Sequence, residues 1–168
     1  DELQGLLGAQ DALALFLPDR TGTYIWVITK TDSAWHRSDL STQALSQLVR
    51  RLRVDLDPTG PARSATSLSQ PSGPRMAPFD DVAAHEIYHE LLEPMAGVLT
   101  DVNHLYVVKD GPLSSLPLSV LLTQPLPNGA ADADDLRQAD WLLNSFAITT
   151  LPAVSSLTTI RSNEPQTS

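Results

Sequence analysis

The chain has 168 residues, of which 42% are hydrophobic, and a net charge of −9 from 11 basic and 20 acidic residues. This length supports one sizeable core, or one domain with an appended subdomain, and no apolar run approaches the roughly 20 residues that span a bilayer, so no membrane partner is expected. The acidic balance argues against a nucleic-acid partner, because neutralising phosphates requires clustered Lys and Arg, and the absence of cysteine excludes disulfides, thiolate metal sites and thiol catalysis within this chain.

The first part of the chain predicts an antiparallel meander. A helix end over residues 3–7 stops at Gly8, and because Asp1 already falls inside this helix, we expect a segment of a larger protein. Three short runs rich in apolar, β-branched or aromatic residues, joined by polar turns, are predicted as strands over residues 11–17, 23–29 and 34–38.

Helical patterns flank a stretch of different composition. Ser41 suits the N-cap of a helix over residues 42–54, whose end carries Arg50, Arg51 and Arg53 as a solvated basic cluster favoured by the helix dipole. Residues 57–78 are rich in Pro, Gly, Ser and Thr and predict a flexible loop that can be inserted within one fold. A long helix is predicted over residues 79–101, starting near Asp80 or Asp81, with Pro94 kinking or splitting it.

The second half predicts βα units. A buried strand over residues 104–109 leads into an apolar segment with a short helix after Pro117, followed by a polar, acidic loop over residues 124–135. A second strand over residues 145–151 is followed by a helix over residues 153–160. Strand, crossover and strand suggest a βαβ-type sheet, which the meander should extend or cover at one end.

These elements predict an α/β fold with a mixed sheet, an N-terminal antiparallel meander and a βαβ-type second half. We expect one partial domain with four parts. Residues 1–56 form a meander plus helix, and residues 57–78 form a flexible loop. Residues 79–160 form a helix with βα units, and residues 161–168 form a frayed tail.

Three dipeptides read as structural signals at the ends of strands. Asp110-Gly111 closes a buried strand, because Gly can adopt the positive φ of a sharp exit and Asp can hydrogen-bond the turn backbone. Leu116-Pro117 and Leu151-Pro152 end extended runs and start helices, where Pro suits the first turn. We interpret all six residues as architectural rather than catalytic.

One motif points to different chemistry. His85-Glu86-Ile87-Tyr88-His89 matches a signature in which two His one helical turn apart bind zinc and the Glu acts as general base. On a helical wheel, His89 and Glu86 share a polar face opposite the apolar one, and His85 lies on the border. This distribution favours a solvated face over a metal centre, so a zinc hydrolase is the least favoured function and no cofactor is expected.

Several segments together resemble one family. They are the hairpin over residues 11–30, the helix Ile87-Tyr-His-Glu-Leu-Leu-Glu-Pro94, the segment His104-Leu-Tyr-Val-Val-Lys-Asp-Gly-Pro-Leu-Ser-Ser-Leu-Pro117 and its continuation, and Trp141 to Leu157 with its Leu-Pro-Ala-Val-Ser. In this order they resemble the front portion of a bacterial CHAT domain, a caspase-like cysteine peptidase module related to separase.

The resemblance implies a dyad of a His followed by Gly and a Cys after Ser-Ala, and neither occurs in this chain. The catalytic strands are therefore expected beyond Ser168, with no catalytic residue and no peptidase activity in this chain alone. We expect a non-catalytic scaffold whose partners are the C-terminal CHAT segment and a helical-repeat region of the same protein. The alternative is an interaction module that docks helical repeats through an open sheet edge. The sequence leaves the compartment open, with the cytoplasm favoured.

Overall fold

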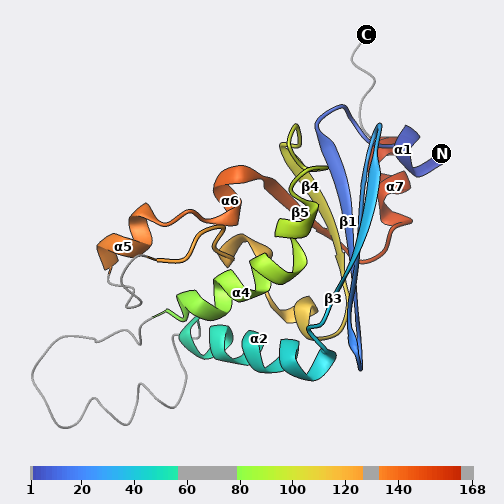
Figure 1. The fold of residues 1–168 in the computed structure, drawn as a ribbon. Helices are drawn as coiled ribbons and strands as arrows, with labels where there is room; N and C mark the ends of the chain where they lie inside the picture. The colour runs from blue at the N-terminus through green and yellow to red at the C-terminus, as the bar shows by residue number, and fades with distance from the viewer. Residues whose placement is uncertain (1, 57–78, 127–132, 164–168) are drawn as a thin grey trace, which may run out of the picture.

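Five strands form one sheet that organises the molecule (Figure 1). The computed structural model describes residues 2–56, 79–126 and 133–163. The strands are β1 Asp11–Asp19, β2 Gly22–Thr29, β3 Ser33–Ser38, β4 His104–Lys109 and β5 Ala147–Leu151. The α-helices are α1 Glu2–Gly5, α2 Thr42–Leu56, α4 Asp81–Leu91, α5 Ala133–Gln138, α6 Leu142–Ser145 and α7 Ser156–Asn163. Three short 3-10 helices are η1 Glu93–Met95, η2 Gly111–Ser115 and η3 Leu118–Val120.

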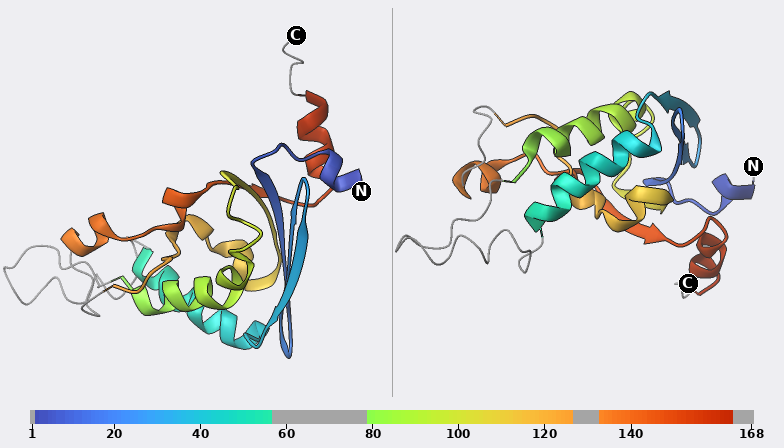
Figure 2. Two further views of the ribbon diagram at one scale, coloured as in Figure 1. Left: turned by 45° about the horizontal axis from the view of Figure 1, so that its top comes forward. Right: turned by 90° about the horizontal axis from the view of Figure 1, so that it is seen from below.

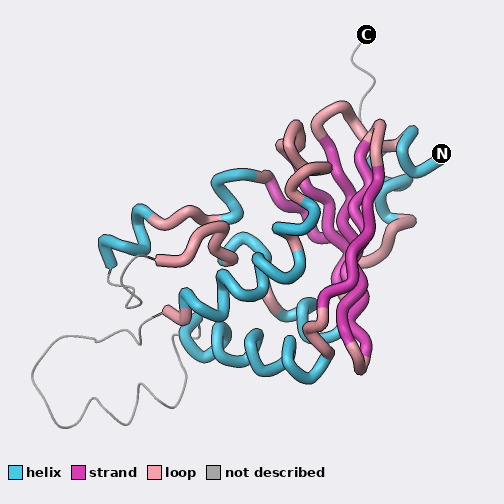
Figure 3. Tube along the Cα trace, viewed as in Figure 1, coloured by secondary structure: helices cyan, strands magenta, loops and turns pink. Residues whose placement is uncertain are grey.

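The sheet is mixed. Its strand order is β3-β2-β1-β4-β5, in which the neighbours β3-β2-β1 are antiparallel and β1-β4-β5 are parallel. This confirms the predicted α/β class with an N-terminal meander and a parallel second half, and the meander extends the sheet rather than covering one of its ends. Figure 3 shows the strands side by side, with most of the helical chain on one side of them.

The first face of the sheet carries the main core. It is built from alternate residues of the strands, which are Ala12, Ala14, Phe16, Ile25, Val27, Leu105 and Val107, all at most 2% exposed. These side chains pack against the apolar stripes of α2 and α4 and against the segment from Leu113 to Leu122. Arg51 of the basic cluster donates from Nε and Nη2 to both carboxylate oxygens of Asp80, at 2.7 and 2.9 Å, and so ties α2 to the start of α4.

The second face of the sheet is covered only in part. Leu13, Tyr106 and Leu151 form a smaller buried cluster with Leu7, which follows α1, and with Leu157 of α7. The views in Figures 1 and 2 place α1 and α7 together on the side of the sheet away from α2 and α4. Farther along the same face, three large apolar side chains are exposed: Leu17 at 46%, Trp26 at 36% and Trp35 at 65%.

The long helix predicted over residues 79–101 is split at Pro94, one of the two expected outcomes. The part after the split is not an α-helix, because α4 stops at Leu91 and η1 and a series of turns follow. Proline lacks the N–H for an intrahelical bond, its ring collides with the preceding turn, and it disfavours helical φ and ψ at the residue before it. The start agrees with expectation, because Asp80 is the N-cap and its side chain accepts from the Ala83 N–H at 2.9 Å.

Two further predictions are corrected. A helix, α5, begins inside the stretch predicted as a loop over residues 124–135. The tail predicted to be frayed from residue 161 is helical over its first residues, because α7 continues through Asn163 and includes Arg161. The predicted loop over residues 57–78 and the tail from residue 164 lie outside the described residues. No helix in the described parts of the chain is both long and apolar enough to cross a membrane.

Candidate functional site

The exit of β4 is a tightly bonded turn at the carboxyl end of the parallel strands. Gly111 adopts a φ of +56°, and the Asp110 carboxylate accepts from the Gly111 N–H at 2.7 Å while capping η2. Lys109 is half-buried and its Nζ donates to the Leu116 carbonyl at 2.6 Å. Burial lowers the pKa of Lys109 below its ordinary value of 10.5. The Lys109 ammonium therefore fastens the far end of this turn, and Asp110 faces solvent.

The two Leu-Pro dipeptides differ in their surroundings. Leu116 is fully buried with extended backbone, and Pro117 is the N-cap residue of η3. Leu151, 4% exposed, ends β5 beneath α7, and Pro152 precedes the first residue of α7 by four positions. The prolines therefore lie just before the helices, not in their first turns. Two other prolines occupy a first turn, Pro94 in η1 and Pro112 in η2.

The His-Glu-x-x-His motif lies on α4, with its two imidazoles directed to different partners. The Nδ1 of His85 lies 3.2 Å from the Leu122 carbonyl oxygen, while His89 pairs with Glu93 one turn later. The ring centroids are 6.0 Å apart, and Glu86 is exposed. Within the described residues, no group of three or more His, Asp or Glu side chains is arranged to hold a metal ion. Both contacts are made by Nδ1, the kind of contact that a metal-bound His commonly keeps from its other ring nitrogen, so they leave the two Nε2 atoms available.

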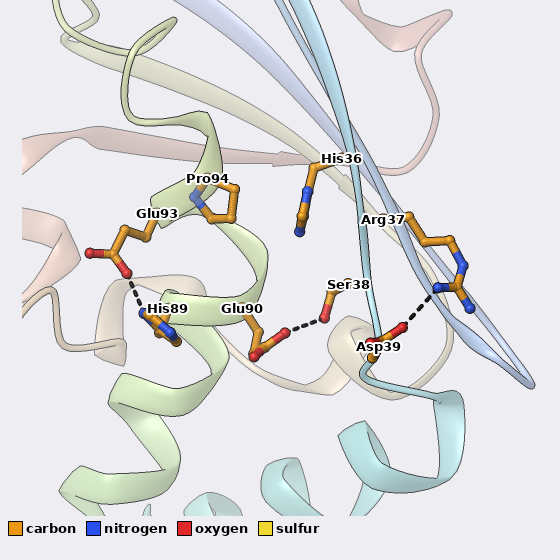
Figure 4. A pocket seen from close by; sticks show the side chains of 8 residues that line it. All are labelled: His36, Arg37, Ser38, Asp39, His89, Glu90, Glu93 and Pro94. Atoms are coloured by element: carbon orange, nitrogen blue, oxygen red, sulfur yellow. Dashed lines mark hydrogen bonds and ion pairs between the residues drawn. The ribbon is translucent and has the colours of Figure 1, made fainter.

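A pocket of about 440 Å³ lies between β3 and the end of α4 (Figure 4). Residues 36–39 line one side, and His89, Glu90, Glu93 and Pro94 line the other. The Ser38 hydroxyl donates to Glu90 Oε2 at 2.7 Å and accepts from the Leu40 N–H at 3.0 Å. The Arg37 and Asp39 side chains pair with each other outside this bridge. The bridge from Ser38 to Glu90 joins the sheet to α4. Three residues with carboxylates line the pocket: Asp39, Glu90 and Glu93.

A polar cluster that our sequence analysis did not identify lies where the parallel strands begin. His104 Nε2 lies 2.8 Å from the Thr149 hydroxyl, and its Nδ1 lies 3.9 Å from Asp11 Oδ1. Asp11 also accepts from the Gly8 N–H and pairs with Arg161. The order carboxylate, imidazole, hydroxyl resembles a nucleophile relay, but 3.9 Å is too long for a hydrogen bond and Asp11 is held by other donors. The cluster therefore anchors α7 rather than activating Thr149.

One signal for this cluster was present in the sequence. Asp11 and His104 are the first residues of their strands, and they pair directly in the parallel register. Polar residues at the starts of buried strands become neighbours when those strands are parallel. The contribution of Arg161 could not be anticipated, because its bond to the Leu6 carbonyl, 2.7 Å long, joins opposite ends of the chain.

The two outer strands leave the sheet open on both sides within the described residues. β5 pairs with β4 alone, and β3 pairs with β2 alone. β5 is parallel to its neighbour, so a further strand beside it would continue the parallel half. A mixed α/β sheet with a tight β4 exit and an open parallel edge is therefore the architecture that any functional assignment must fit.

Comparison with known proteins identifies this architecture. A family model described as the CHAT domain matches residues 81–168, just over half of the chain, and the chain therefore belongs to the CHAT domain family. The match covers α4, β4 and the elements that follow it, whereas the meander and α2 precede it. A comparison with curated proteins gave no match.

Proposed function

We propose that this chain is the non-catalytic scaffold of a CHAT domain, on which a following segment of the same protein completes a caspase-like cysteine peptidase. The scaffold contributes the sheet and the helices of its first face. The nucleophile and its base would come from the added segment, because this chain contains no cysteine and no His followed by Gly. The proposal rests on membership of the CHAT domain family together with the open parallel edge of β5.

The geometry of β5 supports this role. Its residues run from exposed Ala147 to buried Leu151, so the strand is anchored at its carboxyl end. A parallel strand added beside β5 would end near Pro152, close to the exit of β4, because parallel strands bring their carboxyl ends to one edge of the sheet. Ligand and catalytic sites of open α/β sheets lie at that edge. The turn from Asp110 to Leu116 would then form one wall of a site completed by the added strand.

Co-expression tests the proposal. The chain is produced alone and together with the following segment of its parent gene, and cleavage of a peptide library is measured. Cleavage should require both parts, should be lost when the Cys of the added segment is replaced by Ala, and should persist when His36, His85, His89 and His104 of this chain are replaced individually. Cleavage by this chain alone, or by the added segment alone at the same rate, would refute a scaffold role.

A proline scan of β5 supplies a matched control. Prolines at positions whose N–H faces β4 should unfold the chain, whereas prolines whose N–H faces the open edge should leave it folded and block assembly. If prolines at the positions facing the open edge leave cleavage by the two parts unchanged, the added strand does not pair with β5.

A second candidate function is docking of a helical-repeat region. The pocket between β3 and α4 favours it, because the acidic residues Asp39, Glu90 and Glu93 are among those that line it and could attract basic side chains of a partner helix. Tight binding of the repeat region without any gain of cleavage on co-expression is the result that favours this function. Glu93→Lys should then weaken binding, while Arg137→Glu on the distant helix α5 should not.

A further inference from the structure

The outer edge of β3 has an unprotected backbone. Within the described residues β3 pairs with β2 alone, so its other side has no strand partner, although the Ser33 N–H donates to Asp32 Oδ1 at 2.7 Å. Proteins usually protect such edges with proline, lysine, bulges or a covering segment. β3 contains neither proline nor lysine, and Arg37 is its single formally charged residue. An edge of this kind favours pairing with another strand.

An aromatic surface adjoins this edge. Of the five large hydrophobic side chains exposed in the described residues, Leu17, Trp26 and Trp35 lie on the second face of the meander. Trp26 lies directly opposite Trp35 across β2 and β3, and Tyr24 stacks on Trp26 with ring centroids 6.0 Å apart. Trp35, 65% exposed, ends this surface at the sheet edge. The apolar surface therefore ends at the sheet edge, where the backbone of β3 also lacks a strand partner.

We propose that β3 pairs antiparallel with β3 of a second copy of this chain, about a two-fold axis at Trp35. Antiparallel pairing places each residue opposite one on the same face, so a two-fold axis at Trp35 brings the two Trp35 side chains together and sets Ser33 opposite Arg37 of the second copy. The two aromatic surfaces then join into one.

A second copy fits this edge better than a helix does. A helix has no free backbone groups along its side and would leave the N–H and C=O groups of β3 unpaired, whereas an identical strand satisfies them with a self-complementary patch. The interface is small, so the dimer should be weak, and the net charge of −9 on each copy opposes it. Added salt should therefore strengthen the dimer. This inference does not depend on the proposed function, because it uses the edge opposite β5.

Sedimentation equilibrium of the full chain tests the proposal, from about 5 μM to about 1 mM because small interfaces bind weakly. The chain should dimerise reversibly over this range. Trp35→Arg should raise the dissociation constant by roughly tenfold or more, as expected for a central aromatic anchor. The matched control is Val82→Arg, which alters a side chain 58% exposed on α4. A monomer at every concentration, or equal weakening by both variants, would overturn the proposal; circular dichroism confirms that each variant is folded.

Disulfide trapping tests the register independently, because the chain has no native cysteine. Ser33→Cys and Arg37→Cys are made separately, which leaves Trp35 in place. Opposed residues of an antiparallel pair have Cα atoms within disulfide range, so a mixture of the two variants should form a crosslinked dimer on mild oxidation. Each variant alone should not, because its two cysteines would lie several residues apart. Equal crosslinking of either variant alone contradicts the register, and no crosslink in a mixture that dimerises contradicts pairing through β3.

Discussion

The two faces of the sheet are closed to different extents, although the same strands supply both. The first face packs under two long helices and a segment of 3-10 turns, and its central residues have essentially no exposed surface. Of the described helices, α1 and α7 alone cover part of the second face, and the meander part of that face carries exposed Trp26 and Trp35. The stability of the fold should therefore come mainly from the first face, which leaves the second face free to change or to bind.

A matched pair of leucines tests this comparison most strongly. Leu45 of α2 and Leu157 of α7 are both fully buried, on opposite faces. Leu45→Ala should lower the free energy of unfolding by roughly 3–5 kcal/mol, in the range for cavities in a rigid core. Leu157→Ala should cost about half as much, because α7 can detach without unfolding the sheet. Urea denaturation measures both, and equal losses would show that the second face is as rigid as the first.

Gly22 tests how firmly the exposed meander is held. A Cβ at this position would lie 2.5 Å from the Ser38 carbonyl oxygen, which is backbone and cannot move freely. Gly22→Ala should therefore cost about 2–3 kcal/mol by forcing β2 and β3 apart. Gly97→Ala is the control, since no atom lies within 4 Å of its Cβ. Thermal melts compare the two variants, and similar melting temperatures would mean that β3 adapts easily.

Arg161 tests the attachment of α7 to the second face. Its guanidinium donates to the Leu6 carbonyl, pairs with Asp11 and lies over the Tyr106 ring at 5.6 Å. Arg161→Ala should cost about 1–2 kcal/mol, since bonds to charged groups contribute this much when partly buried. Hydrogen exchange should show loss of protection in α7 with β1 and β4 unchanged. Uniform loss across the sheet would mean that α7 does not open independently.

Alkaline titration gives the smallest effect and concerns the first face. Burial lowers the pKa of Lys109, so in the range below its ordinary 10.5 the unfolded chain binds more protons and stability rises with pH. Burial, followed by repulsion from Glu93, raises the pKa of Tyr88, so stability falls as pH rises above 10.0. Lys109→Met should remove the rise and Tyr88→Phe the fall, measured as urea midpoints between about pH 8 and pH 11. Unchanged profiles would show that both groups are solvated.

Local patterns predicted the strands well and the long-range contacts poorly. The predicted strand over residues 104–109 matches β4 at both ends, because a continuous apolar run with Asp-Gly behind it is a local signal. Pro94 was expected to kink or split the long helix, but the apolar spacing beyond it was wrongly taken to continue as α-helix. α5 was missed because its acidic sequence is typical of a loop, and the bond from the Trp141 indole to the Leu136 carbonyl is not visible in the sequence.

The candidate site divides in the same way. The positive φ of Gly111 follows from residue type, whereas the burial of Lys109 follows from packing by residues far along the chain. The cluster of Asp11, His104 and Arg161 depends on strand register and on both ends of the chain meeting. Neither the register nor the meeting of the two ends can be read from a single sequence, because the same residues at other registers would be solvated.

The central position of β1 has a kinetic consequence. Its antiparallel partner β2 follows after a two-residue turn, so this hairpin can form within about 1–10 μs. Its parallel partner β4 comes much later in the sequence, since Asp11 pairs with His104, and this pairing must first offset the entropy of closing a long loop. The meander should therefore form first. The side of β1 that pairs with β4, together with the apolar side chains of β1, should stay exposed until β4 has been added to the sheet. During synthesis on the ribosome, that interval is when this chain would depend most on chaperones.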